Sequence, residues 1–250
     1  MFSLDRYLAS KGSPEDNVVL ETYSPEDAIV ASQYYEADSP ELTVFFPPWH
    51  GAREVTSKMI AKLARRGAVL AYDFHDHILE PDVDKVLASH EFISDTVAGD
   101  IEKRRANGGF ERLHLLGMSL GNAALAMTTS KIDGNFTRAT TVVPGSSLAH
   151  SLWNGVRTQG MRAAFEKEGI SVEELNDAWK TLNPSHHAHL MGGKLVRAQL
   201  STSDGFIPPA YGEQYVTDLE TAGADVEVHR SRLGHAMNII SFCLRPPRDL

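Results

Sequence analysis

The sequence has one cysteine, no long apolar run and no excess of positive charge. The lone thiol, Cys243, excludes an internal disulfide and suits a reducing compartment. No stretch approaches the roughly 18 continuous apolar residues of a transmembrane helix. The first residues lack the basic start and apolar core of a secretory leader. We therefore expect a cytoplasmic protein with no membrane span.

Acidic residues outnumber basic ones, 33 to 24, which gives a net charge of -9. A nucleic-acid partner needs clustered positive charge, so none is expected. A small anionic substrate stays open, because a local field can differ from the total charge. The 250 residues fit one large α/β domain or two small ones, and nothing in them sets the oligomeric state.

Short apolar runs alternate with amphipathic stretches along most of the chain, which predicts strands joined by helices. The predicted strands are residues 18–23, 28–35, 42–46, 68–73, 113–116, 138–143, 194–200 and 225–229. The predicted helices are residues 2–10, 53–66, 93–105, the stretch after 121, 208–222 and 235–244. Residues 74–92 are predicted to be irregular.

This alternation indicates an α/β fold with a mainly parallel sheet of about eight strands and helices on both faces. Residues 18–23 and 28–35 are predicted to form a hairpin, the antiparallel edge of the sheet. In such sheets a ligand binds beyond the C-terminal ends of the strands. Catalytic residues are therefore expected in the loops after residues 46, 73, 116, 143, 200 and 229.

The sharpest motif is Gly117-Met118-Ser119-Leu120-Gly121. An apolar run precedes it and a stretch rich in Ala and Leu follows, so strand, tight turn and helix are predicted in succession. The two glycines relieve crowding at the turn. The hydroxyl of Ser119 would then project beyond the sheet, near a helix N-terminus that favours negative charge.

This serine-bearing turn resembles the nucleophile elbow of the α/β-hydrolase family. The resemblance covers residues 18 to 245 and implies one α/β-hydrolase domain over residues 1–250, with a helical cap inserted at 146–190. It implies a serine hydrolase that needs no cofactor. Asn122 stands where many relatives have another small residue, and the motifs do not single out a subfamily.

A serine hydroxyl needs a base to become a nucleophile, and the base needs an orienting partner. Among 11 histidines, His235 lies just after the last predicted strand, at the correct edge. His114 falls inside a strand and is expected in the core. Asp204 is the carboxylate of the loop after residue 200, and its alternative role is to cap a turn. The order Ser119, Asp204, His235 is the order of the resembled family.

The resemblance also implies two backbone N–H donors for an oxyanion. One is Leu120, the residue after the serine. The other comes from the loop Trp49-His50-Gly51-Ala52, with Ala52 as the matching position and Trp49 as the fallback. A glycine-rich run is lacking there, and the Pro47-Pro48 pair stands in its place.

Residues 146–190 interrupt the strand–helix alternation. Ser171 and Glu174 form a predicted capping box, followed by a helix over 172–182. A second helix is expected over 160–167. Six apolar residues could line an acyl site, although packing of the cap onto the domain is the favoured explanation for most of them: Leu148, Leu152, Trp153, Met161, Phe165 and Trp179.

Two clusters contain histidines, a residue type that can bind a metal: residues 75–77 and residues 186–189. Neither has the helical spacing of a zinc motif, so no metal site is expected. The preferred hypothesis is a carboxylesterase acting on a small acyl substrate. Thioester or amide cleavage, acyl transfer, and a relative that binds a ligand without turnover are the alternatives.

Overall fold

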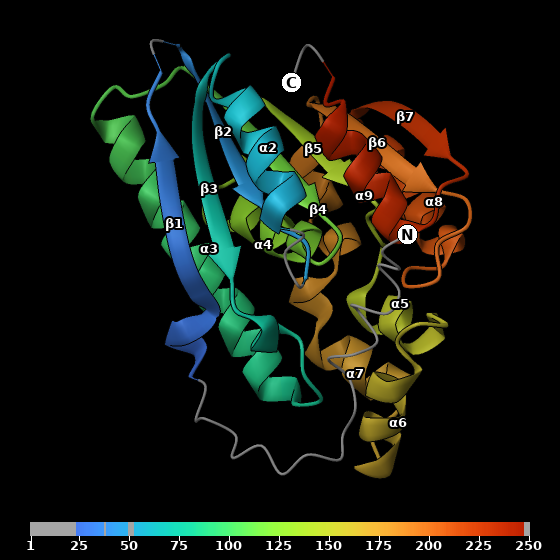
Figure 1. Ribbon diagram of the computed structural model, residues 1–250. Coiled ribbons are helices and arrows are strands. Elements are labelled where there is room, and N and C mark those ends of the chain that lie inside the picture. Colours follow the sequence, from blue (N-terminus) through green and yellow to red (C-terminus); the bar gives the residue numbers. More distant parts are fainter. Residues whose placement is uncertain (1–23, 38, 50–52, 248–250) are drawn as a thin grey trace.

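A computed structural model describes residues 24–37, 39–49 and 53–247. Its described residues contain one mixed sheet of seven strands in the order β1-β3-β2-β4-β5-β6-β7. Strands β2 to β7 run parallel to one another, and β1 is antiparallel to β3 (Figure 1). The strands are β1 (Ile29–Tyr35), β2 (Glu41–Phe46), β3 (Ala68–Phe74), β4 (Arg112–Met118), β5 (Arg138–Val142), β6 (Leu195–Ser201) and β7 (Asp225–Ser231).

The antiparallel N-terminal edge is confirmed, and the described residues give β1 a neighbour that the sequence did not indicate. Strand β1 pairs with β3, which comes later in the chain, with Ser32 opposite Tyr72 and Tyr35 opposite Val69. The predicted strand 18–23 and helix 2–10 lie outside the described residues. The hairpin with residues 18–23 therefore stays a prediction, and among the described residues β1 is an edge strand of the sheet.

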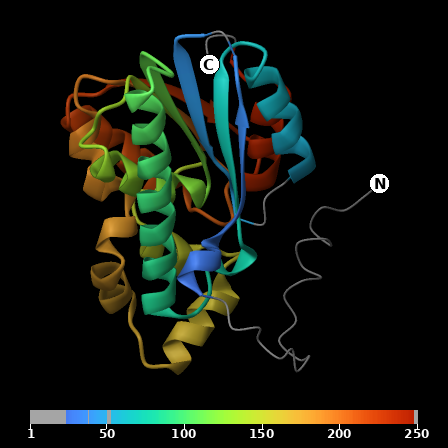
Figure 2. The same ribbon diagram turned by 90° about the vertical axis from the view of Figure 1, so that its left-hand side faces the viewer.

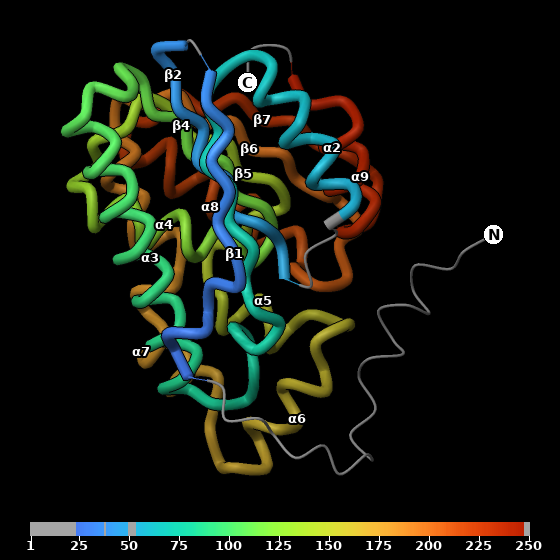
Figure 3. Tube along the Cα trace, turned by 60° about the vertical axis from the view of Figure 1, so that its left-hand side comes forward, coloured from blue at the N-terminus to red at the C-terminus, as the bar shows by residue number. Residues whose placement is uncertain are grey.

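Helices cover both faces of the sheet, as predicted. Figure 2 shows α3 and α4 on one side of the sheet and α2 on the other. Figure 3 shows the same layers with β1 at the front edge and α9 beside α2. The α-helices are α2 (Arg53–Leu63), α3 (Val83–Ala106), α4 (Gly121–Lys131), α5 (Leu148–Asn154), α6 (Gln159–Lys167), α7 (Val172–Ala178), α8 (Pro209–Thr221) and α9 (His235–Leu244). The 3-10 helices are η1 (Pro25–Ala28), η2 (Asp76–Ile78), η3 (Lys180–Leu182) and η4 (Pro184–Met191).

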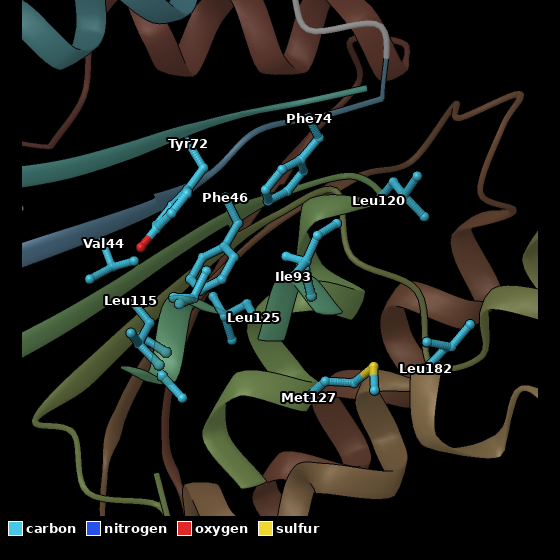
Figure 4. Close-up of a cluster of buried hydrophobic side chains, with 14 of the residues drawn as sticks. Val44, Phe46, Tyr72, Phe74, Ile93, Leu115, Leu120, Leu125, Met127 and Leu182 are labelled. Carbon is cyan, nitrogen blue, oxygen red and sulfur yellow. The ribbon is translucent and has the colours of Figure 1, made fainter. Parts of the chain in front are cut away.

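The core consists of two layers, because alternate side chains of a strand point to opposite faces. Val44 and Phe46 of β2 join the cluster under α3 and α4, drawn in Figure 4. Phe45, between them, joins the cluster under α2 and α9. Strands β2, β3 and β4 are buried along nearly their whole length because helices cover both faces there, whereas the edge strands β1 and β7 are mostly exposed or half-buried.

The prediction that residues 74–92 are irregular is wrong from Val83 onward. Helix α3 begins there, and the Asp82 side chain accepts a hydrogen bond from the Lys85 N–H at 3.0 Å. Its buried face has helical spacing and comprises Val86, His90, Ile93, Val97 and Ile101. A histidine within that face interrupts the apolar pattern, so the periodicity predicted a helix only over residues 93–105.

Residues 146–190 connect β5 to β6 and contain α5, α6 and α7, which lie below the sheet in Figure 1. The capping box is confirmed: Ser171 Oγ accepts from the Glu174 N–H, and the Glu174 carboxylate accepts from the Ser171 N–H at 2.9 Å. Helix α7 ends at Ala178, and η3 replaces the last predicted turn. Helix α5 is an additional helix that the sequence did not indicate.

Among the residues that the structure describes, no helix is both long enough and apolar enough to cross a membrane.

Candidate active site

Ser119 lies at the sharp turn between β4 and α4. Its φ angle is +51°, in the left-handed region that non-glycine residues rarely adopt. The Ser119 N–H donates to the Val142 carbonyl at 2.9 Å, so the turn is bound to the neighbouring strand β5. Such strain costs of order 1–3 kcal/mol and persists where the surroundings enforce it.

Both glycines of the motif are required by close approaches. A Cβ atom on Gly121 would lie 2.4 Å from the Phe46 carbonyl oxygen and 2.5 Å from that of Pro47. A Cβ atom on Gly117 would lie 2.7 Å from Oδ1 of Asn122. The glycines thus let the start of α4 pack directly on the end of β2, as the elbow interpretation predicts.

The structure brings the three predicted side chains together beyond the C-terminal ends of the strands. Ser119 Oγ lies 2.8 Å from His235 Nε2. His235 Nδ1 lies 2.7 Å from Asp204 Oδ2. Ser119 comes from the β4–α4 turn, Asp204 from the loop after β6, and His235 from the first residue of α9. Residues 116 positions apart along the chain therefore form one hydrogen-bonded row.

The Asp204 carboxylate is held on both oxygens. Oδ1 accepts from the N–H groups of Phe206 at 2.8 Å and Ile207 at 2.9 Å, while Oδ2 faces His235. Its side chain is 3% exposed and that of His235 is 11% exposed. Because an ionised carboxylate only accepts hydrogen bonds, it fixes the proton of His235 on Nδ1 and leaves Nε2 as an acceptor for Ser119.

The predicted oxyanion donors divide into three cases. The Leu120 N–H follows Ser119 and donates to no backbone acceptor within the described residues. Trp49 lines the cleft beside Ser119, and its indole N–H donates to the Asp76 carbonyl at 2.7 Å. Ala52 lies outside the described residues. The Leu120 group is therefore available to a bound substrate, and the second donor stays a prediction.

A cleft of about 570 Å³, counted with its solvent-open part, adjoins Ser119. Of the six apolar residues predicted to line an acyl site, Leu148 and Leu152 of α5 do so. The other four do not, and Phe165 and Trp179 pack edge-to-face on each other with ring centroids 5.6 Å apart. The cleft is lined by Trp49, Leu79, Ser119, Leu120, Asn122, Ala123, Gly145, Ser147, Leu148, Ser151, Leu152, Thr158, Pro184, Phe206 and Ile207.

The cleft wall also contains residues that were not predicted to belong to the site, and Leu79, Phe206 and Ile207 are the largest apolar ones among them. The Phe206 ring also packs on His235, with centroids 5.0 Å apart. The signal was present, since both residues 206 and 207 belong to the loop after β6 that the strand-end rule selects. Leu79 lay in the stretch predicted to be irregular, so its position could not be anticipated.

His114 and the single cysteine lie in places that indicate a structural role. His114 is buried in β4 between Thr43 and Thr140, as expected, and burial lowers its pKa to about 3. Cys243 is buried too, which raises the pKa of its thiol to about 12. Neither histidine cluster belongs to a group of three metal-ligating side chains in the part of the chain that the structure describes.

No protein-family model matches the sequence, and no curated protein matches it significantly. Solved structures do resemble the fold. An esterase of Pyrococcus furiosus aligns with a TM-score of 0.59 and 13% identity, over 84% of this chain and 77% of the esterase. A thermostable esterase from Pseudomonas putida aligns with a TM-score of 0.55 and 15% identity, over 86% and 73%.

An acylaminoacyl peptidase of Pyrococcus horikoshii aligns with a TM-score of 0.59 and 14% identity, over 83% of this chain. The chain spans only 36% of that peptidase. Together with the strand order, these likenesses show that the chain adopts the α/β-hydrolase fold.

Proposed function

We propose that the protein is a serine hydrolase that cleaves carboxylic esters through an acyl-enzyme intermediate. The observation that carries the proposal is the row Ser119 Oγ, His235 Nε2, His235 Nδ1 and Asp204 Oδ2, with successive contacts of 2.8 and 2.7 Å. A buried histidine between a hydroxyl and an anchored carboxylate is the arrangement that makes serine a nucleophile.

In the first step the Ser119 oxygen attacks the acyl carbon while its proton passes to His235 Nε2. The tetrahedral intermediate then collapses, and His235 returns that proton to the departing alkoxide. Water repeats the sequence on the acyl-enzyme, with His235 again as base, and releases the carboxylic acid. Asp204 holds the tautomer and stabilises the imidazolium form throughout.

Negative charge on the carbonyl oxygen is stabilised by backbone N–H groups. Leu120 supplies one, at the start of α4, and Ala52 or Trp49 supplies the second. Each such donor is typically worth about 3 kcal/mol of transition-state stabilisation. The helix N-terminus adds a favourable dipole at the same place.

The cleft points to an uncharged acyl group. None of the described residues that line it carries a charged side chain, and its wall is formed largely by Trp49, Leu120, Leu148, Leu152 and Phe206. Burial of an apolar acyl chain in such a cleft lowers the free energy of binding. A carboxylate or ammonium group would lose its hydration there without gaining a partner. Residues 146–190 supply one side of the wall and act as the cap of this site.

Turnover of a matched substrate panel tests the proposal. We expect p-nitrophenyl esters with acyl chains from acetate to octanoate to be hydrolysed, with Ser119→Ala reducing kcat at least about 10⁴-fold. Thioesters and anilides with the same acyl groups rank the ester against the other leaving groups. Undiminished turnover by Ser119→Ala would contradict the mechanism, and tight ligand binding without any turnover would favour a binding protein.

A further inference from the structure

Two buried asparagines occupy equivalent places beside the nucleophile and the base. Asn122 lies three residues after Ser119, in the first turn of α4, and Asn238 lies three residues after His235, in the first turn of α9. Their side chains are buried, with exposures of 2% and 0%. A buried amide costs free energy unless it is hydrogen-bonded, so their partners indicate what they do.

Asn122 binds the nucleophile turn to β5. Its Nδ2 group donates to the carbonyl of Ser119 at 3.0 Å and to that of Val142 at 3.1 Å. Because both partners are acceptors, the amide has one possible orientation. Its Oδ1 atom is buried without a partner among the described residues, in the space that Gly117 leaves by lacking a Cβ atom.

Asn238 binds the base helix to β6 in the same way. Its Nδ2 group donates to the Leu200 carbonyl at 3.1 Å, and its Oδ1 atom accepts from the side-chain amide of Gln199. The Gln199 side chain also reaches the Asn238 carbonyl, at 3.3 Å. The first turn of α9 is therefore fixed to the C-terminal end of β6.

The two anchoring points meet in one rung of the sheet. Val142 of β5 and Gln199 of β6 are register partners, and the Val143 N–H donates to the Gln199 carbonyl at 2.8 Å. Val143 also has a left-handed φ of +46°, although it is β-branched, so the chain bends sharply here too. A continuous path of hydrogen bonds thus joins α4 to α9 through this rung.

We propose that Asn122 and Asn238 are positioning residues that set the distance between Ser119 Oγ and His235 Nε2. This inference rests on the proposed function and adds to it two residues that touch neither the reacting hydroxyl nor the imidazole through a hydrogen bond. Small displacements of a nucleophile from its base slow the chemical step strongly while substrate binding is retained.

The test compares Asn122→Ala and Asn238→Ala with the wild type and with Thr128→Val. Thr128 is a matched control, because it is a buried polar residue of α4 whose hydroxyl donates to the Ala124 carbonyl at 2.8 Å, away from the site. Three quantities are measured for each protein well below its Tm: kcat, KM for an ester substrate, and the rate constant of fluorophosphonate labelling of Ser119.

We expect each asparagine variant to lose at least about tenfold in kcat and in labelling rate, with KM within about twofold. Thr128→Val should have a lower Tm but the wild-type kcat and labelling rate. Where an alanine variant does not fold, the serine variant at that position carries the test, and a partial loss of both rates is expected because its hydroxyl keeps one donor.

Wild-type rates in folded asparagine variants would overturn the inference and leave the proposed function standing. The inference would also be overturned if kcat and the labelling rate fell only as far as Tm falls, and fell by the same amount in Thr128→Val. A wild-type protein that neither labels nor turns over would defeat the proposed function, and the inference with it.

Discussion

Ser119 is an ordinary alcohol whose reactivity depends on a few neighbouring atoms. The decisive one is His235 Nε2, and its availability depends in turn on where Asp204 holds the imidazole proton. The Phe206 and Ile207 N–H groups orient Asp204 by binding its other oxygen. Each atom of the row therefore has a defined partner, and removing one partner should affect rate more than stability.

Replacing Asp204 with asparagine tests this dependence. The amide can donate to His235 Nδ1, which favours the tautomer with its proton on Nε2 and removes the acceptor for Ser119. We expect kcat to fall by roughly 10³- to 10⁴-fold with little change in KM. Steady-state kinetics on an ester measure the loss.

Asp95→Asn is the control, because Asp95 pairs with Lys131 on the surface and such pairs contribute little. A folded Asp204→Asn variant with the same kcat as Asp95→Asn would show that Asp204 only caps its loop, the alternative that the sequence left open.

At the scale of elements, the β4–α4 turn determines where the proposed nucleophile, Ser119, lies. Local sequence predicted it well, because glycines, an apolar strand and a good helix-forming segment all occur within 20 residues. Helices α3 and α5 were harder. A histidine interrupted the buried face of α3, and α5 is a seven-residue helix stabilised by packing and by Ser147, whose hydroxyl accepts from the His150 N–H.

Gly121→Ala should be strongly destabilising, because its Cβ atom would fall 2.4 Å from a backbone oxygen that cannot move aside. We expect the free energy of unfolding to drop by about 1–3 kcal/mol, the usual range for overpacked sites. Chemical denaturation measures the change.

Gly99→Ala is the matched control within α3. Nothing lies within 4 Å of a Cβ atom at position 99, so alanine should stabilise the helix by about 0.5–1 kcal/mol. Equal effects of the two substitutions would contradict the close packing of α4 on the end of β2.

For the molecule as a whole, the sequence predicted the sheet, its parallel character, the antiparallel edge and the loops that carry the site. It did not predict which strand borders β1, because that pairing joins segments about 40 residues apart. The sequence also did not predict the hydrogen bonds that link Asn122 and Asn238 through β5 and β6, because side-chain bonds to strand ends depend on the register of the strands. The cytoplasmic location stays a prediction.

Buried histidines make global stability depend on pH. Burial lowers the pKa of His90 from 6.5 to about 4 and that of His114 to about 3. Below pH 6.5 the unfolded chain therefore takes up protons that the folded chain does not. The stability that these two groups contribute is complete above that pH and is lost as the pH falls, by about 1.4 kcal/mol per pH unit for each histidine.

His90→Leu isolates one of these contributions. The Nε2 atom of His90 has no partner among the described residues, and Nδ1 donates to the Val86 carbonyl of its own helix. We expect the variant to be as stable as the wild type at pH 7 and less sensitive to acid between pH 6.5 and 4. Urea unfolding at several pH values measures both; parallel pH curves would contradict a neutral buried His90.

The proposed function requires the hydroxyl of Ser119 to be an activated nucleophile. Incubation with a fluorophosphonate probe, followed by mass measurement of the intact protein and its peptides, tests it most directly. We predict one adduct per chain, located on Ser119, absent from Ser119→Ala and formed much more slowly by Asp204→Asn. Folded wild-type protein that stays unlabelled, or is labelled at another residue, would contradict it.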